Sequence, residues 1–332
     1  MNHLESPDSS KFFALPMLTY LSLFNNSLSS EFPSFIFNCP NLTYLDLSQN
    51  NLTGPIPGSL VSSLQKIEYL NLTAHFFQGS LPKNMSKLVA PKHLRLGMNS
   101  FEGGIPKENG LISSLHQLEL YNNSLGGEIP SSLCQLRMLH SLDITANGLN
   151  STIPHELGYC TILTFINLAI NSLTGTLPPS LSNLTKISEL GISRNLLSGE
   201  ISPHLIASWV QLISLQLQNN YFTGKIPQEI GILTKLQYLY HYHNQVFGSI
   251  PPEIGTLKDL LELDFSENTV TGPITVTMGN LTQLEILNLF ENNLTGIIPP
   301  EFGNMTFLIM LDVNTNQLQG ELPDTISHLE NL

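Results

Sequence analysis

The sequence predicts an α/β repeat protein in which one short strand and one outer turn recur along the chain. Three observations support this prediction. An asparagine recurs every 24 or 25 residues, leucines alternate with other residues just before it, and a Gly-x-Ile-Pro segment follows it. A fixed period in this range is typical of a solenoid, in which each repeat contacts only its neighbours. The recurring asparagines, called the asparagine ladder below, are Asn26, Asn50, Asn99, Asn123, Asn147, Asn171, Asn195, Asn220, Asn244, Asn268, Asn292 and Asn316.

The first element of each repeat is a strand. In the copy that starts at Leu284, Leu287 and Leu289 lie two residues apart, so both side chains point to one face of a strand. One such strand cannot bury its apolar face alone, whereas stacked copies form a parallel sheet with a continuous core. We therefore expect a parallel β-sheet on the concave side of the solenoid.

The ladder asparagine comes next, where the chain turns away from the sheet. Backbone amide and carbonyl groups buried at this turn need hydrogen-bond partners. An asparagine side chain supplies both a donor and an acceptor, so a column of inward-facing asparagines can satisfy them in every repeat. His75 occupies the single ladder position that lacks asparagine.

The last part of the repeat is the Gly-x-Ile-Pro segment and a short outer stretch. Proline fixes φ and has no amide hydrogen, which suits a second extended segment. Too few residues follow for a long helix, so we expect 3-10 turns on the convex side. Clear copies of the Gly-x-Ile-Pro segment are residues 54–57, 127–130, 224–227 and 296–299.

This unit resembles the plant-type leucine-rich repeat, and the Gly-x-Ile-Pro part is specific to that subtype. The resemblance implies a right-handed leucine-rich-repeat solenoid with a concave parallel β-sheet and 3-10 or short helical turns on the convex side. Departures from the pattern are few: Ser151 replaces the glycine, Ser202 and Thr275 replace the proline, and His241 replaces an inward leucine.

The period also predicts the domain organisation. We expect a solenoid of about 13 repeats of 24–25 residues over residues 18–326. Residues 1–17 are expected to be the tail of a truncated leading repeat, and residues 327–332 the start of a further truncated repeat. No pattern of a signal peptide follows Met1, and the family usually caps both ends with cysteine pairs that are missing here. We therefore expect the chain to be a segment of a longer protein or the product of a truncated gene.

Composition narrows the range of partners. Charged residues make up 12% of the chain, with 26 Asp and Glu against 13 Lys and Arg. This balance argues against nucleic acid and favours a neutral or basic partner. Three cysteines give no disulfide framework. Cys39 and Cys160 occupy the same position of the repeat, which indicates small buried side chains.

Eleven Asn-x-Ser/Thr sequons indicate an extracellular, glycosylated surface. Some sequons arise by chance in a repeat rich in Asn, Ser and Thr, but this number suits a secreted chain better than a cytosolic one. The candidate glycosylation sites are Asn25, Asn41, Asn51, Asn71, Asn84, Asn122, Asn150, Asn183, Asn280, Asn293 and Asn304.

The sequence contains no phosphate-binding glycine loop, no G-x-S-x-G, no H-E-x-x-H and no kinase signature. His241 and His243 come nearest to a metal pair, but His241 holds an inward strand position and His243 lies in the following turn. These two side chains should point apart. We expect no catalytic residues, no cofactor and no metal site.

The outward strand positions predict where a ligand binds, because solenoids bind through the concave sheet. One strand carries three tyrosines, flanked by glutamines on one side and carboxylates on the other, as in an interface hot spot. This stretch has no sequon between Asn183 and Asn280, whereas a glycan on Asn71 would obstruct the sheet. The alternative is that tyrosines are simply good strand formers. The predicted ligand-binding residues, called the tyrosine patch below, are Gln216, Gln218, Tyr238, Tyr240, Tyr242, Glu262, Asp264 and Ser266.

Three substitutions follow from this assignment. Tyr240→Ala and Asp264→Ala are each expected to weaken ligand binding with little change in melting temperature. His241→Leu is expected to stabilise the protein, because it restores the inward leucine.

The resemblance implies a function as well as a fold. The chain looks like the ligand-recognition segment of a plant leucine-rich-repeat receptor-like kinase, on the extracellular side of the plasma membrane. Its implied partners are a secreted peptide or protein and a possible leucine-rich-repeat co-receptor kinase. Any Ser/Thr kinase activity would reside in a domain absent from this chain. Two alternatives are a secreted inhibitor of cell-wall-degrading enzymes and a kinase-less receptor-like protein, and the sequence downstream of Leu332 would distinguish them.

Overall fold

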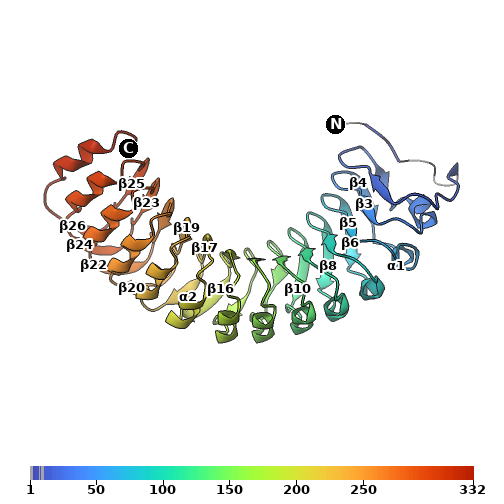
Figure 1. Cartoon of the computed structure of the whole chain (residues 1–332), viewed down its shortest axis with the longest axis horizontal. Coiled ribbons are helices and arrows are strands. Elements are labelled where there is room, and N and C mark those ends of the chain that lie inside the picture. The colour runs from blue at the N-terminus through green and yellow to red at the C-terminus, as the bar shows by residue number, and fades with distance from the viewer. Residues whose placement is uncertain (1–2, 7, 9–10) are drawn as a thin grey trace. The chain divides into compact units, whose positions relative to one another are not determined.

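The computed structural model describes residues 3–6, 8 and 11–332, in two compact units divided between Leu163 and Thr164. In each unit, parallel strands lie side by side on the concave side and short helical turns lie on the convex side (Figure 1). The predicted α/β repeat solenoid is therefore confirmed. The two units are called unit 1 and unit 2 below.

The concave sheet consists of three-residue strands paired in parallel and in register. In unit 1 its strands are β1 (Tyr20–Ser22), β3 (Tyr44–Asp46), β5 (Tyr69–Asn71), β7 (His93–Arg95), β9 (Gln117–Glu119) and β11 (Ser141–Asp143). In unit 2 they are β13 (Phe165–Asn167), β15 (Glu189–Gly191), β17 (Ser214–Gln216), β19 (Tyr238–Tyr240), β21 (Glu262–Asp264), β23 (Ile286–Asn288) and β25 (Met310–Asp312).

A second set of strands follows each ladder position. Most of these strands end within one residue of the glycine of Gly-x-Ile-Pro, which adopts a positive φ, such as +77° at Gly54, so the Ile-Pro part lies beyond the strand. In unit 1 these strands are β2 (Ser29–Ser30), β4 (Asn51–Gly54), β6 (Phe76–Ser80), β8 (Ser100–Gly104), β10 (Ser124–Gly127) and β12 (Gly148–Leu149). In unit 2 they are β14 (Thr174–Gly175), β16 (Leu196–Glu200), β18 (Tyr221–Thr223), β20 (Phe247–Gly248), β22 (Thr269–Pro273), β24 (Asn293–Gly296) and β26 (Gln317–Leu318).

The convex side carries one short helical turn in each repeat. The 3-10 turns of unit 1 are η2 (Ser34–Asn38), η3 (Lys83–Lys87), η4 (Lys107–Leu111), η5 (Ser131–Gln135) and η6 (His155–Tyr159). Those of unit 2 are η7 (Pro179–Asn183), η8 (Gln228–Ile232), η9 (Pro252–Thr256), η10 (Val276–Asn280), η11 (Pro300–Asn304) and η12 (Asp324–His328). Proline stands before most of these turns with an extended ψ, which fixes where each one begins.

Two turns are α-helical, α1 (Ser59–Ser63) and α2 (Pro203–Ser208). They occur in the repeats that extend the ladder interval to 25 residues, between Asn50 and His75 and between Asn195 and Asn220. In α1 the Leu64 amide bonds to the Leu60 carbonyl, an i→i−4 bond that needs one residue more than a 3-10 turn. The extra residue is therefore accommodated on the convex side, and the strands on either side keep their register.

The asparagine ladder joins successive repeats. The Asn292 side-chain amide donates to the backbone oxygens of Leu289 (3.2 Å) and, one repeat earlier, Phe265 (2.9 Å). Its oxygen accepts from the Val270 amide at 2.9 Å. Asn50, Asn195 and Asn244 form the same pattern. Each ladder asparagine thus satisfies buried backbone groups of its own repeat and of the one before.

Two histidines replace regular members of the core. His75 takes the ladder position, where its Nδ1 accepts from the Leu52 amide at 3.3 Å and its buried Nε2 has no partner among the described residues. His241 takes an inward leucine position between the rings of Phe222 and Phe265, at 6.0 and 6.4 Å between centroids. Its Nε2 is likewise buried and unbonded. Burial lowers the pKa of each histidine from an ordinary 6.5 to about 4, so both are neutral in the folded protein at neutral pH.

The lowered pKa values of His75 and His241 predict how the free energy of unfolding depends on pH. Above pH 6.5 neither the folded nor the unfolded state binds the extra proton. Between pH 6.5 and 4 the unfolded chain binds it and the folded chain does not, so the free energy of unfolding falls as the pH falls. The loss is at most about 3 kcal/mol per histidine. Urea unfolding at a series of pH values measures it.

The matched control is the double variant His75→Asn/His241→Leu. Asparagine restores the missing ladder donor and leucine restores the inward apolar side chain, so this variant should be more stable at neutral pH. It should also lose less stability between pH 6.5 and 4 than the wild-type protein. Equal losses in the two proteins would contradict the assignment.

Candidate ligand-binding surface

The centre of the tyrosine patch lies on the concave sheet of unit 2. Register places Tyr240 of β19 beside Gln216 of β17 and Asp264 of β21, and Tyr238 beside Glu262. The rings of Tyr238 and Tyr240 are 6.4 Å apart and tilted by 32°. All of these side chains except Asp264 are half-buried, so part of each faces solvent.

Tyr240 and Glu262 form a defined polar pair. The Tyr240 hydroxyl donates to Glu262 Oε2 at 2.6 Å. Burial, and then the hydrogen bond to Glu262, raise the pKa of Tyr240, so its hydroxyl remains protonated at physiological pH. The carboxylate keeps further acceptor sites for a donor on a ligand. The pair therefore suits a ligand that brings amines, guanidinium groups or hydroxyls.

Two residues of the tyrosine patch are buried, which corrects the prediction that they face a ligand. Asp264 is 9% exposed and Ser266 is 1% exposed. Asp264 Oδ1 accepts from the Ser266 amide at 2.9 Å and from its hydroxyl at 2.5 Å, and Asn288 donates to Oδ2 at 3.0 Å. The alternation of a strand gives the direction of a side chain but not whether the following turn covers it. Asp264 therefore holds the turn after β21.

The remaining members of the tyrosine patch lie nearby on the same strands or just beyond them. Gln218 and Tyr242 are half-buried and follow β17 and β19. His243, beyond Tyr242, is exposed and its Nδ1 lies 2.6 Å from Glu267 Oε2, whereas His241 points into the core. Six residues of the patch thus form its half-exposed centre: Gln216, Gln218, Tyr238, Tyr240, Tyr242 and Glu262.

A second aromatic surface, not predicted from the sequence, lies on the concave sheet of unit 1. The rings of Tyr20 and Tyr44 stack at 4.2 Å, those of Tyr44 and Tyr69 at 4.3 Å, and His93 continues the row 5.6 Å from Tyr69. These four residues, the aromatic column, occupy the same position of four successive strands. Aligning that position across repeats, rather than along one strand, would have identified it.

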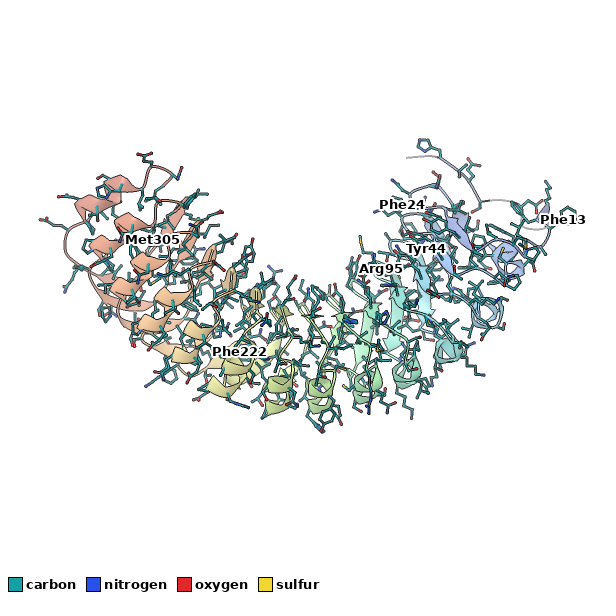
Figure 2. The ribbon with its side chains drawn as sticks, in the orientation of Figure 1. Phe13, Phe24, Tyr44, Arg95, Phe222 and Met305 are labelled. Carbon is teal, nitrogen blue, oxygen red and sulfur yellow. The ribbon has the colours of Figure 1, made fainter. Side chains whose placement is uncertain are left out.

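Charged side chains surround the end of the aromatic column. The Arg95 guanidinium lies 5.5 Å from the centre of the Tyr69 ring and its Nε lies 3.6 Å from Glu119. Figure 2 shows Tyr44 and Arg95 on the strand-lined side of unit 1. Lys92 and Glu68 form a further ion pair at 2.7 Å. The end of the column is therefore a mixed aromatic and polar surface on which Arg95 and Lys92 each have a carboxylate partner.

Three histidines lie in a row beside this surface. The rings of His93 and His116 are 6.3 Å apart, and those of His116 and His140 are 5.5 Å apart. Burial lowers the pKa of His116. Within the part of the chain that the structure describes, no group of three or more His, Cys, Asp or Glu side chains is arranged to hold a metal ion.

The sequons differ in accessibility. Ten of the eleven asparagines are exposed or half-buried, whereas Asn71 is 7% exposed on β5. Its Nδ2, the atom that would carry a glycan, donates to the Ser48 hydroxyl at 3.1 Å. The outward orientation expected of Asn71 therefore does not make its amide accessible. No helix among residues 3–6, 8 and 11–332 is long and apolar enough to cross a membrane.

Because Asp264 is buried, Asp264→Ala should destabilise the protein, whereas the sequence alone predicted little change in melting temperature. Asp264→Ala should lower the free energy of unfolding by about 1–3 kcal/mol, because the buried Ser266 amide loses its acceptor. Glu262→Ala, on the same strand but half-exposed, is the control and should have a smaller effect. Thermal unfolding monitored by circular dichroism measures both. An unchanged midpoint for Asp264→Ala would contradict the structural role.

Asn71 and Asn51 offer a matched test of glycosylation, because both begin an Asn-Leu-Thr sequence. Asn51 is exposed and Asn71 is buried and hydrogen-bonded. In folded protein secreted from a glycosylating host, glycopeptide mapping should find glycan on Asn51 and none on Asn71. A glycan on Asn71 in a folded preparation would show that the Asn71–Ser48 contact is dispensable.

Comparisons with known proteins agree with this geometry. The family described as "Leucine rich repeat" matches residues 16–75, and single repeats match residues 114–136, 163–184, 211–233 and 283–305. No curated protein sequence gives a match.

Among solved structures, similarity extends over nearly the whole chain. The plant peptide hormone receptor RGFR1, in complex with RGF2, is 31% identical with a TM-score of 0.83, over 96% of this chain and 58% of that one. A second similar structure is the ectodomain of the Arabidopsis thaliana membrane receptor kinase GASSHO1/SCHENGEN3 in complex with CASPARIAN STRIP INTEGRITY FACTOR 2. It is 31% identical with a TM-score of 0.84, over 99% of this chain and 42% of that one. The Leptospira interrogans leucine-rich-repeat protein LIC12759 is 30% identical with a TM-score of 0.77, over 95% of this chain and 82% of that one.

The chain spans about half the length of the two plant receptor structures. Its fold nevertheless matches theirs over nearly its whole length, with TM-scores of 0.83 and 0.84. The chain belongs to the leucine-rich-repeat family, and its right-handed solenoid is similar to the ectodomains of plant receptor kinases.

Proposed function

We propose that this chain is the ligand-recognition part of a plant cell-surface receptor, and that it binds an extended peptide on its concave sheet. The main observation that supports the proposal is the half-exposed centre of the tyrosine patch. Tyrosine buries a large area at low entropic cost, and neighbouring glutamine and glutamate side chains can fix the orientation of a peptide. In this proposal the chain recognises a ligand and performs no catalysis.

The spacing of the strands suits an extended ligand. Successive strands of a parallel sheet lie about 4.8 Å apart, so a peptide that crosses β17, β19 and β21 meets a new set of outward side chains at each strand. Ring edges of Tyr238 and Tyr240 supply apolar contact. The Gln216 amide and the Glu262 carboxylate supply hydrogen bonds for the peptide backbone and side chains.

Charge supports a ligand that is neutral or basic. The chain has a formal net charge of −13. Glu189 is exposed on β15, which pairs with β17, and Glu291 is exposed just after β23, which pairs with β21. Glu262 is half-buried within the patch. Long-range attraction would therefore favour peptides with lysine, arginine or a free amino terminus.

The relatives support the same class of ligand. RGFR1 is described as a peptide hormone receptor and was solved in complex with RGF2, and the GASSHO1/SCHENGEN3 ectodomain was solved with a bound factor. By analogy, the partner of this chain is a secreted peptide, with a leucine-rich-repeat co-receptor kinase as a possible second partner. A kinase would belong to a longer protein that contains this segment.

Selection from a displayed library of linear peptides tests the proposal. The wild-type chain should enrich neutral to basic peptides, and Tyr240→Ala should weaken their binding at least tenfold, or about 1.4 kcal/mol. Tyr240→Phe keeps the ring and loses the bond to Glu262, so it should weaken binding less. Calorimetric titration of the selected peptides measures each affinity.

Tyr221→Ala is the matched control, because Tyr221 is 50% exposed on β18, away from the concave sheet. It should leave the affinity unchanged. Equal binding by the wild-type chain and Tyr240→Ala would remove the tyrosine patch from consideration. If Tyr44→Ala alone abolished binding, the aromatic column of unit 1 would be the site instead.

A further inference from the structure

Two cysteines depart from the repeat pattern in adjacent outer turns of unit 1. The first is Cys134, in η5, at a position where six other 3-10 turns carry glycine and three carry serine. At Gly110, Gly255 and Gly279 an added Cβ would lie 2.1, 2.3 and 2.4 Å from a backbone oxygen of the next turn. The repeat thus favours glycine at this position because neighbouring turns approach closely. Cys134 brings a Cβ and a sulfur into this space.

The second departure is Cys160, which follows η6. Neighbouring repeats carry Leu136 and Leu184 at this position, and both are buried in the core. Cys160 is 1% exposed, and its thiol donates to the backbone oxygen of Leu133 at 3.7 Å. The smaller side chain leaves room for a neighbouring thiol, and Cys134 supplies one.

The two cysteines lie in adjacent turns. The Cys160 sulfur is 3.7 Å from the backbone oxygen of Leu133, the residue that precedes Cys134, although the two cysteines are 26 positions apart in the sequence. Cys39 provides an internal comparison, because it occupies the Cys160 position of an earlier repeat. The corresponding partner position, 26 residues before Cys39, is Phe13, and the Cys39 thiol donates to the Phe35 carbonyl at 3.7 Å. A cysteine that only fills the core therefore needs no second thiol.

A route from solvent reaches the pair. A surface pocket of about 490 Å³ lies against the convex turns and is lined by Cys134, Gln135, Arg137, Tyr159 and Thr161. Cys134 is 9% exposed, so a small disulfide such as oxidised glutathione can approach its sulfur. Cys160 is 1% exposed and does not line the pocket, so Cys134 is the thiol that a solvent-borne disulfide meets first.

We propose that Cys134 and Cys160 form a disulfide that covalently joins two neighbouring repeats on the convex side. The Cys134 thiolate attacks oxidised glutathione, forming a mixed disulfide and releasing one glutathione. The Cys160 thiolate then attacks the Cys134 sulfur and releases the second glutathione. The two cysteines lose two protons and two electrons, which reduce glutathione disulfide to two thiols. The neighbouring Cys160 thiol and burial raise the pKa of Cys134, so the first attack is favoured by alkaline pH.

The disulfide constrains the unfolded chain by closing a loop of one repeat. It forms in an oxidising compartment and remains a pair of thiols in a reducing one. The redox state of the pair in native protein consequently reports the compartment in which the chain folds.

Tryptic mapping tests the proposal directly. Arg137 separates the two cysteines, so Cys134 lies in the peptide of residues 108–137 and Cys160 in that of residues 138–186. After incubation of folded protein with oxidised glutathione and alkylation without reductant, mass spectrometry should find these peptides linked. Thiol titration of the denatured product should find one free thiol, that of Cys39. Three free thiols, or a linkage that includes Cys39, would overturn the proposal.

Stability provides the second readout. The oxidised protein should unfold about 4 °C above the reduced protein. Cys134→Gly restores the repeat pattern and so should fold, and in this variant the difference should disappear. Cys39→Ser should retain the full difference, because it leaves the pair intact. An equal response to reductant in the wild-type protein and Cys134→Gly would overturn the proposal.

Discussion

The asparagine ladder is the interaction on which the rest of the structure depends. Every repeat leaves the sheet through a tight corner, where a residue with positive φ, such as Gln49 or Glu291, precedes the asparagine. That corner buries amide and carbonyl groups that no sheet or helix bond can reach. The asparagine side chain satisfies groups of its own repeat and of the one before, so it links local turn geometry to the stacking of repeats.

The binding surface follows from this stacking. Because the ladder keeps successive strands in register, outward positions align into columns across strands, as with Tyr20, Tyr44 and Tyr69. A column is a property of several repeats together, so one substitution changes the surface presented by its neighbours. The same register explains why Tyr240 meets Glu262, a residue 22 positions away in the sequence.

Much of the fold could be predicted from the sequence, because a fixed period specifies strands, corners and turns at once. Whether a side chain at an outward strand position is exposed or buried was harder to predict. Asp264 and Ser266 were expected to face a ligand, yet both are buried and hydrogen-bond to each other at the turn after β21. The aromatic column was missed because it runs across strands, and the cysteine pair because its spacing differs from the repeat by two positions. These features depend on contacts between repeats rather than on the pattern within one.

The position of the two α-helical turns bears on how such chains change in length during evolution. Ladder bonds connect each asparagine only with the adjacent repeat, so duplication or loss of one complete repeat recreates the same bonds on both sides of the junction. A single inserted residue is tolerated only on the convex side, where α1 and α2 absorb it. Length should therefore vary in whole repeats, and small insertions should accumulate in the outer turns, leaving the concave surface free to diversify by substitution alone.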